Sequence, residues 1–380
     1  MHWGYIFWAV VLCLSIGSLL VRPFLNRFAS SMRRSEEALQ DALKDARTAI
    51  RRDDWQAAVS ACDRAGSMLS HSDIVLWLER LVRGSRGLER IKAEVATARS
   101  DMYFFRAFAL ENLGRLDQAA AEYDRCLEFI DRGARPLRIP QVYLRQGLVL
   151  ARLGRWAESE KKLQWCAANI EDPSLHRLRL DALRTLAALC WTTRRSEEAL
   201  NYTREALRFA RTMVEEFAEG QLLDALGDMH TALNQYDEGL RNYELSLDVF
   251  RRLGHGGALM MLQRDIAHLF QRQGDWPKAL AWLQVCLREA ESNEDLATQA
   301  ATAYELGCLH IIRGDLGDAI GLLMRSMGLF RRVQDKEGVS RVGSTLMGLG
   351  ITMQRQASAD RMTYGDIVRG SVKKPDEGKS

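Results

Sequence analysis

The sequence predicts an all-α protein, an α-solenoid of stacked helix pairs preceded by one transmembrane helix. Three observations support this prediction. Small residues recur with a fixed period of 40 residues through the middle of the chain, and a period of this size indicates a solenoid. Proline, which breaks helices, accounts for only 6 of the 380 residues. The segment 3–21 is apolar and carries no charge.

The N-terminal segment has the length and the flanks of a membrane-spanning helix. As a helix, residues 3–21 would be roughly 28 Å long at about 1.5 Å per residue, which matches a bilayer core. Arg22 and Arg27 follow the span, and no Lys or Arg precedes it. The positive-inside rule then places the rest of the chain in the cytoplasm. Three aromatic residues stand at the other end, where interfacial anchors are expected: Trp3, Tyr5 and Trp8.

Other interpretations of this segment stay open. A cleavable signal peptide would end at a small-residue site such as Ser15-Ile16-Gly17, but it normally begins with basic residues, which are missing here. A lipoprotein anchor at Cys13 is disfavoured by the bulky residues that precede it. Insertion in the opposite direction would make the whole array extracytoplasmic.

Composition excludes some classes of function. The chain has 53 basic and 50 acidic residues, and this near balance argues against a nucleic-acid binder, which usually has a strongly basic domain. Its 7 cysteines are scattered without metal-ligand spacing. They are typical of small apolar core residues in a reducing compartment, with a disulfide or redox role as the alternative.

The repeat consists of three sets of small residues in register. In each unit one set lies in a first helix and two lie in a second helix after a polar turn, so that the two helix axes can approach closely. The first-helix set is Ala107, Gly147, Ala187, Gly227, Ala267 and Gly307. The second-helix sets are Ala119, Ser159, Ala199, Gly239, Ala279 and Ala319, and Cys126, Cys166, Ala206, Ser246, Cys286 and Ser326.

At these residues the chain resembles the tetratricopeptide repeat (TPR) family. The motif is seen in Gly147, Ser159, Leu163 and Cys166, and again in Gly227, Gly239, Tyr243 and Ser246. The family period is about 34 residues, so a period of 40 is similar to long-helix variants such as kinesin-light-chain-like arrays. HEAT repeats have a similar period without this small-residue pattern. The resemblance implies a right-handed superhelix of helix pairs.

The repeat positions also predict the domain organisation. An earlier helix pair is expected at 38–66, where Ala58, Cys62 and Ala65 repeat the small-residue pattern. The last apolar face of a solenoid needs a cap. The expected segments are 1–34 (transmembrane helix and basic juxtamembrane segment), 35–99 (first helix pair and extra linker helices), 100–335 (six TPR-like repeats), 336–355 (capping helix) and 356–380 (disordered polar tail).

The sequence contains no catalytic pattern. Gly254, Gly256 and Gly257 are not followed by the Lys-Ser/Thr of a phosphate-binding loop. His230 and His310 lie two repeat periods apart, so they are not expected to share a metal ion. We therefore expect no enzyme, no cofactor and no metal site.

The resemblance implies instead a peptide-binding groove lined by the first helices. The residue three before the small one and those one and five after it would face this groove. In one unit these are Arg264, His268 and Arg272, a basic stripe that would bind acidic or carboxylate groups. The alternative is a solvated face whose Asp and Arg side chains pair across neighbouring units. The other groove residues proposed are Arg152, Arg184, Asp224 and Asp228, with aromatic surface from Phe104, Phe108, Trp191 and Tyr304.

Taken together, these features predict a membrane-anchored TPR scaffold or adaptor that mediates protein–protein interactions at the cytoplasmic face. Its partners would be other proteins or peptides with acidic or carboxylate groups, and not nucleic acids. The first alternative is an extracytoplasmic, periplasmic scaffold of an envelope machine for secretion, motility or envelope biogenesis. The second is a peptide-sensing regulatory protein.

Overall fold

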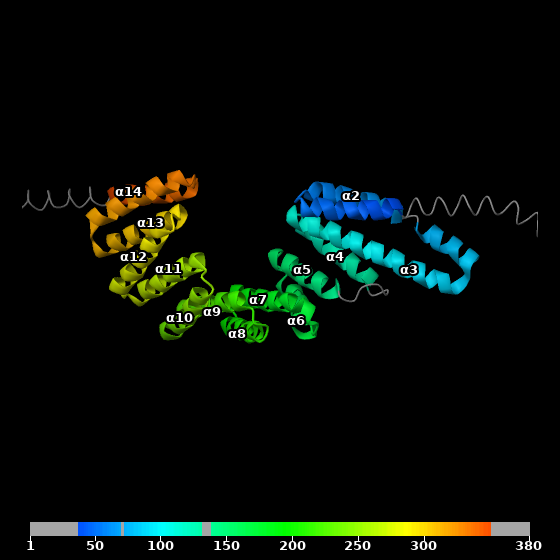
Figure 1. Cartoon of the computed structure of the whole chain (residues 1–380), viewed down its shortest axis with the longest axis horizontal. Coiled ribbons are helices and arrows are strands. Elements are labelled where there is room, and N and C mark those ends of the chain that lie inside the picture. Colours follow the sequence, from blue (N-terminus) through cyan, green and yellow to red (C-terminus); the bar gives the residue numbers. More distant parts are fainter. Residues whose placement is uncertain (1–36, 70–71, 131–137, 351–380) are drawn as a thin grey trace, which may run out of the picture. The chain divides into compact units, whose positions relative to one another are not determined.

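A computed structural model of the chain describes residues 37–69, 72–130 and 138–350, with the backbone alone for 72–91. Within these ranges every regular element is a helix (Figure 1). No helix among them is both long and apolar enough to span a bilayer. The expected transmembrane segment 3–21, the basic flank that follows it and the tail 356–380 all lie outside the described residues.

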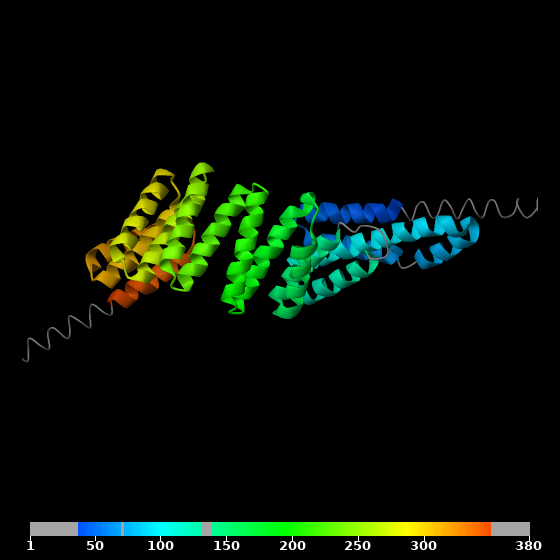
Figure 2. The same ribbon diagram turned by 90° about the horizontal axis from the view of Figure 1, so that it is seen from below.

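The chain divides into two compact units, which we call unit 1 and unit 2, between Tyr202 and Thr203. In each unit, neighbouring helices stack side by side (Figure 2). Unit 1 contains a helix over 37–51, α2 (Trp55–Leu69), α3 (Ser72–Asn112), α4 (Leu116–Ile130), α5 (Ile139–Arg152), α6 (Trp156–Asn169), the short η2 (Pro173–Leu175), α7 (His176–Thr192) and the start of α8 (Ser196–Thr212).

Unit 2 contains the rest of α8, three further helix pairs and one last helix. Its elements are α9 (Glu216–Ala232), α10 (Tyr236–Arg252), α11 (Gly256–Gln273), α12 (Trp276–Ser292), α13 (Leu296–Arg313), α14 (Leu316–Arg332) and a helix over 336–350. The second helices α4, α6, α8, α10, α12 and α14 begin at residues 116, 156, 196, 236, 276 and 316, each 40 residues after the last. The expected capping helix 336–355 is helical as far as the described residues extend, to 350.

One element differs from the expected organisation. Linker helices were expected up to residue 99 and a repeat from residue 100, but α3 runs through this boundary as a single helix of 41 residues. The segment contains no proline, and its glycines, Gly84 and Gly87, each weaken a helix by only about 1 kcal/mol. Nothing in the sequence therefore ends the helix before the turn at Gly114, which has a φ of 75°.

The first-helix small residues lie where two helices cross. A Cβ atom added to Gly147 would lie 2.8 Å from Leu163 side-chain atoms of the paired helix. At Gly227 the same atom would lie 2.4 Å from the ring of Tyr243. These separations are shorter than any van der Waals contact. The predicted reason for the small residues, close approach of the paired helices, is therefore confirmed at these crossings.

The second small position of the second helices has a further role. Where it is Cys or Ser, the side chain donates a hydrogen bond to a first-helix carbonyl 26 residues earlier in the chain. The bonds are Cys126 to Ser100 (3.2 Å), Cys166 to Pro140 (3.5 Å), Ser246 to Gly220 (2.8 Å), Cys286 to Met260 (3.4 Å) and Ser326 to Ala300 (2.7 Å). Burial raises the pKa of the Cys126 and Cys166 thiols to about 12. These cysteines are core residues, as expected, and the fold itself keeps them in the thiol form.

Candidate functional site

First helices line a cavity in unit 1. It has a volume of about 840 Å³ and is formed by α3, α5 and α7, of which α5 contacts both others. The lining residues are Phe104, Gln141, Leu144, Arg145, Leu148, Leu178, Asp181, Arg184, Thr185 and Ala188. We call this cavity the unit 1 groove. A volume of about 300–1,000 Å³ is usual for a ligand site in a protein.

The groove lining combines apolar and polar side chains, and we call the apolar part its floor. Leu144 is buried and Leu148 is half-buried, and both belong to this apolar part. The polar side is formed by Gln141, Arg145, Asp181, Arg184 and Thr185. Partial burial raises the pKa of the Asp181 carboxyl, although the nearby arginines act in the opposite direction. Such a surface offers apolar contact and hydrogen bonding to the same ligand.

The two groove arginines are held differently. Arg145 lies 4.7 Å from the centre of the Phe108 ring and pairs with Glu111 at 3.5 Å. Glu111 in turn accepts a hydrogen bond of 2.8 Å from the Tyr123 hydroxyl. Arg184 is exposed and forms no ion pair with any residue that the structure describes. The charge of Arg184 acts on the carboxyl of Asp181, three residues earlier on the same helix, and the exposed guanidinium also faces solvent.

Sequence reasoning identified part of this lining. Residues three before and one after the first-helix small residue do line the groove, among them Phe104, Leu144, Leu148 and Arg184. It missed Arg145 and Asp181, which lie two and six places before their small residues. Asp181 could have been found by continuing the helical stripe for one more turn towards the N-terminus. Arg145 lies beside the stripe, next to Leu144, and would have been found only by allowing a wider groove-facing surface. Arg152, also proposed as a groove residue, is exposed on α5 and lies outside the lining.

The proposed basic stripe of unit 2 makes contacts inside the protein. Arg264 on α11 donates from Nε to both carboxylate oxygens of Glu305 on α13, at 3.1 and 3.2 Å. Arg272 donates to the Asn234 side chain at 2.9 Å. His268 is exposed. Arg264 is therefore paired across neighbouring repeats, which is the alternative that the sequence offered. The peptide-binding role of the stripe stays a prediction.

Asp224 and Asp228 belong to a group of three carboxylates on α9 and α11. Asp228 accepts a hydrogen bond of 2.6 Å from the Tyr243 hydroxyl. Burial and repulsion from Asp265 and Asp228 raise the pKa of Asp224 to about 7. Burial and the Asp228 charge raise the pKa of Asp265 to about 7 as well. Asp265 was missed by sequence reasoning because it lies two places before its small residue, as Arg145 does.

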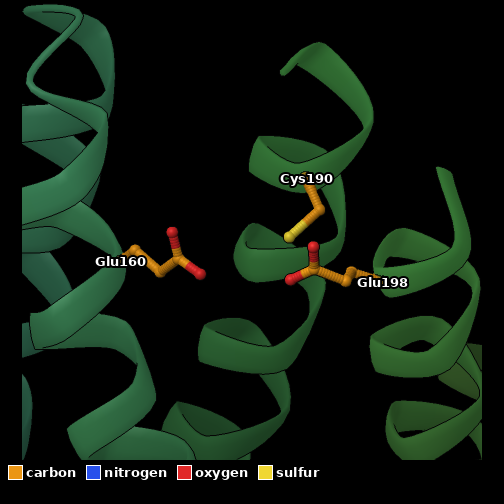
Figure 3. Close-up of side chains that lie close together, drawn as sticks. All are labelled: Glu160, Cys190 and Glu198. Atoms are coloured by element: carbon orange, nitrogen blue, oxygen red, sulfur yellow. The ribbon is translucent and has the colours of Figure 1, made fainter. Parts of the chain in front are cut away.

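One side-chain cluster in unit 1 has potential metal ligands. Glu160, Cys190 and Glu198 point towards one another from three helices (Figure 3), with ligand atoms within 4.8 Å. Arg195, however, donates to Glu160 at 2.9 and 3.0 Å and to Glu198 at 3.1 Å. Burial also raises the pKa of the Cys190 thiol. The charge of both carboxylates is thus already balanced by a guanidinium, so the cluster is an ion network between helices and a poor metal site.

Comparison with known proteins identifies the repeat. Residues 219–292 and 100–130 match models of the tetratricopeptide repeat. The chain contains tetratricopeptide repeats. The first of these segments spans α9 to α12, and the second spans the end of α3 and α4. No curated protein matches the chain significantly.

Several solved structures are similar to this chain at low sequence identity. The C-terminal part of a TPR repeat-containing protein from Cytophaga hutchinsonii aligns with a TM-score of 0.51 at 12% identity, over 78% of this chain and 98% of that one. BtubC from P. vanneervenii gives 0.49 at 17% identity, over 58% and 92%. A Rap protein complexed with competence and sporulation factor gives 0.42 at 16% identity, over 85% and 99%. At these identities the likeness to the Cytophaga protein supports the all-α repeat fold alone.

Proposed function

We propose that this protein is a membrane-anchored scaffold or adaptor, and not an enzyme, which binds partner proteins at the cytoplasmic face through its first helices. The observation that carries the proposal is the unit 1 groove, because three successive first helices combine apolar side chains with two arginines, one of which is exposed. Tetratricopeptide repeats usually serve in protein–protein interaction, which supports the same function. No feature of the groove suggests a chemical reaction.

Two finer points belong to this proposal. The repeat is a 40-residue, long-helix variant of the tetratricopeptide repeat, which is supported by the 17-residue length of α8, α10, α12 and α14. The anchor is the uncharged segment 3–21, which is supported by its length, its aromatic residues at one end and its arginines at the other. An anchor of this kind would concentrate partners at the membrane surface.

The direction of insertion is tested by the accessibility of a cysteine near the C-terminus. Native cysteines are first replaced by Ser, which already occupies the equivalent repeat position at Ser246 and Ser326. Ser371→Cys then supplies one thiol within the tail. In intact cells a membrane-impermeant thiol reagent should leave it unlabelled, and permeabilisation should allow labelling. Labelling of intact cells would contradict the cytoplasmic assignment and favour the extracytoplasmic scaffold of an envelope machine.

Partner binding through the groove is tested by site-specific photocrosslinking in native membranes. A photoreactive residue in place of Leu148 reports on the groove floor. The matched control replaces Lys161, an exposed residue of the second helix α6. We expect a crosslinked partner from position 148 and none from position 161. Equal crosslinking at both positions, or none at 148, would show that partners do not use the groove.

A further inference from the structure

We propose that unit 2 carries a self-association surface, through which two copies of this chain pair about a two-fold axis. The surface lies where α8 and α10 end and where α9 begins, and it shares no residue with the unit 1 groove. It is therefore independent of the proposed function. A second copy is the partner because the surface combines a projecting apolar residue, a cavity and charges that complement one another.

Exposed apolar side chains gather at this place. Large apolar residues are exposed at eleven described positions, and five of these fall within residues 213–253. The rings of Phe217 and His255 are 5.1 Å apart, so the turns that follow α8 and α10 lie side by side. A contiguous apolar patch at a protein surface marks a site of contact with another molecule. We call this set the unit 2 patch, and it consists of Met213, Val214, Phe217, Leu245 and Leu253.

Val214 is the most exposed residue of the patch and the most strained. Its side chain is 76% exposed, and its backbone has a φ of 57°. Among the described non-glycine residues with positive φ, it is the only one whose side chain is apolar. Left-handed backbone in a β-branched residue is an outlier, and an outlier of this kind supports a hypothesis of function. An apolar side chain held in a turn at a cost to the single chain is suited to insertion into a partner.

A cavity that can receive such a side chain lies on the same edge of unit 2. It has a volume of about 520 Å³ and is formed by the end of α8, the start of α9 and the last turns of α10. Its apolar lining includes Leu223 and Val249, which are buried, and Leu245, which is 50% exposed. In a two-fold interface the same surface of each copy contacts the other. A projection and a cavity on one surface can therefore both be filled by a second copy.

The charges around the patch also complement one another. Glu216, two residues after Val214, lies 4.0 Å from Arg252 of the cavity lining, and both side chains are well exposed. Arg251 of the lining lies 3.5 Å from Asp248. Such loose exposed pairs contribute at most about 1 kcal/mol to folding, so exchanging partners between two copies costs little. The balance of acids and bases also disfavours an anionic lipid surface, which attracts a basic face.

Insertion of Val214 into the cavity of a second copy is tested by disulfide crosslinking in native membranes. Two differently tagged proteins, whose native cysteines are replaced by Ser, carry Val214→Cys and Leu245→Cys respectively. Each chain has a single thiol, so a disulfide dimer that contains both tags forms only between copies. We expect this dimer on mild oxidation. The matched control pairs Val214→Cys with Met324→Cys, at a 58% exposed residue of α14, and should give no dimer.

Charge reversal tests the pairing of Glu216 with Arg252 between copies. Full-length protein in detergent is labelled with donor and acceptor dyes at Ser371→Cys, and energy transfer on dilution gives the dissociation constant. Arg252→Glu and Glu216→Arg each place like charges opposite one another and should weaken self-association at least about tenfold. Mixing the two variants restores both opposite-charge pairs, so the mixture should associate as tightly as wild type. Arg332→Glu, at the equivalent exposed position of α14, should change nothing.

The inference requires both the disulfide between positions 214 and 245 and the recovery of association on mixing, and failure of either overturns it. A dimer without these properties would use another surface. Single copies at every concentration would leave the patch to a lipid surface or to another protein, and would likewise overturn the inference. Circular dichroism of each charge variant shows whether its helices remain folded, and recovery on mixing requires that they do.

Discussion

At the scale of single residues, the repeat depends on a few side chains whose size is fixed by the neighbouring helix. Gly227 is the clearest case, because the ring that it contacts cannot move. Tyr243 is 1% exposed, and its hydroxyl donates to Asp228 at 2.6 Å. Ala187 and Ala267 occupy the equivalent position in other repeats. The size of side chain that this position accepts therefore depends on the residue that faces it from the paired helix.

We predict that Gly227→Ala destabilises the protein. The new methyl group would lie 2.4 Å from ring atoms of Tyr243, and overpacking of this kind costs about 1–3 kcal/mol. The matched control is Gly321→Ala in α14, where nothing lies within 4 Å of the added atom. There the same substitution should stabilise the helix by about 0.5–1 kcal/mol. Thermal unfolding followed by circular dichroism measures both, and shifts of the same sign would refute the packing explanation.

The paired carboxylates of unit 2 predict a dependence of stability on pH. The pKa of Asp224 and that of Asp265 are each raised to about 7 in the folded protein, whereas an unfolded Asp has a pKa of about 3.9. The folded state therefore binds more protons than the unfolded state between these values. Stability should be highest at the acidic end of this window and should fall as the pH rises to about 7.

Asp224→Asn should remove part of this dependence. Above pH 7 the variant should be more stable than wild type by about 1–2 kcal/mol, since one pKa unit is worth about 1.4 kcal/mol and solvent screens part of the effect. Denaturant unfolding at several pH values measures the slope. Glu244→Gln, at an exposed residue of α10, is the control and should leave the slope unchanged. If the free energy of unfolding depended equally steeply on pH in Asp224→Asn and in wild type, the Asp224 carboxyl would not be the source of the pH dependence.

At the scale of elements, equivalent turns between helices share a left-handed residue, but the type of residue at this position differs in how well it adopts that conformation. A left-handed residue follows each first helix in the repeats, as at Gly114, Gly154 and Gly274. The turns that follow the second helices α8, α10, α12 and α14 use the same conformation, with Gly254 in one and Val214 in another. Valine is branched at Cβ, so its φ of 57° is the least favourable of these.

We predict that Val214→Gly stabilises unit 2. Left-handed backbone costs an ordinary residue about 1–2 kcal/mol, and the Val214 side chain is 76% exposed, so little apolar burial is lost. The greater freedom of glycine in the unfolded chain offsets part of this, which leaves a gain of about 1 kcal/mol. Gly254→Val, at the equivalent turn 40 residues later, should have the opposite effect. A lower melting temperature for Val214→Gly would show that the Val214 side chain makes a stabilising contact.

Elements also show how far the sequence could predict the site. The period placed the first helices and two of their groove-facing positions, because these follow from helical geometry alone. Pairing across neighbouring repeats was an alternative that the sequence offered, but it could not show that the partner of Arg264 is Glu305, since this depends on how closely α11 and α13 approach. The continuity of α3 across residue 99 was not expected from the repeat boundaries, but Gly84 and Gly87 are only weak helix formers and do not end the helix.

At the scale of the whole molecule, the most extensive helix contacts within each unit, among the described residues, join helices that are neighbours along the chain. In unit 2, α10 contacts α9 and α11, and α12 contacts α11 and α13. Stability in such an array is approximately the sum of repeat terms and nearest-neighbour interfaces. A repeat removed in register should therefore leave the remaining interfaces intact, whereas removal out of register should expose an apolar helix face.

We predict that deleting residues 255–294 leaves a folded protein. The deletion removes one period and joins Gly254 to Asp295, so that a left-handed turn residue again precedes α13 as Glu294 does in wild type. Helicity per residue should stay the same, and the denaturant m-value should fall in proportion to the lost surface. The control deletion of 255–274 removes α11 alone and leaves α12 without its paired helix. It should lower helicity and cause aggregation, because an unpaired apolar face cannot be buried within the repeat. If both deletions behaved alike, the 40-residue pair would not be the unit of packing.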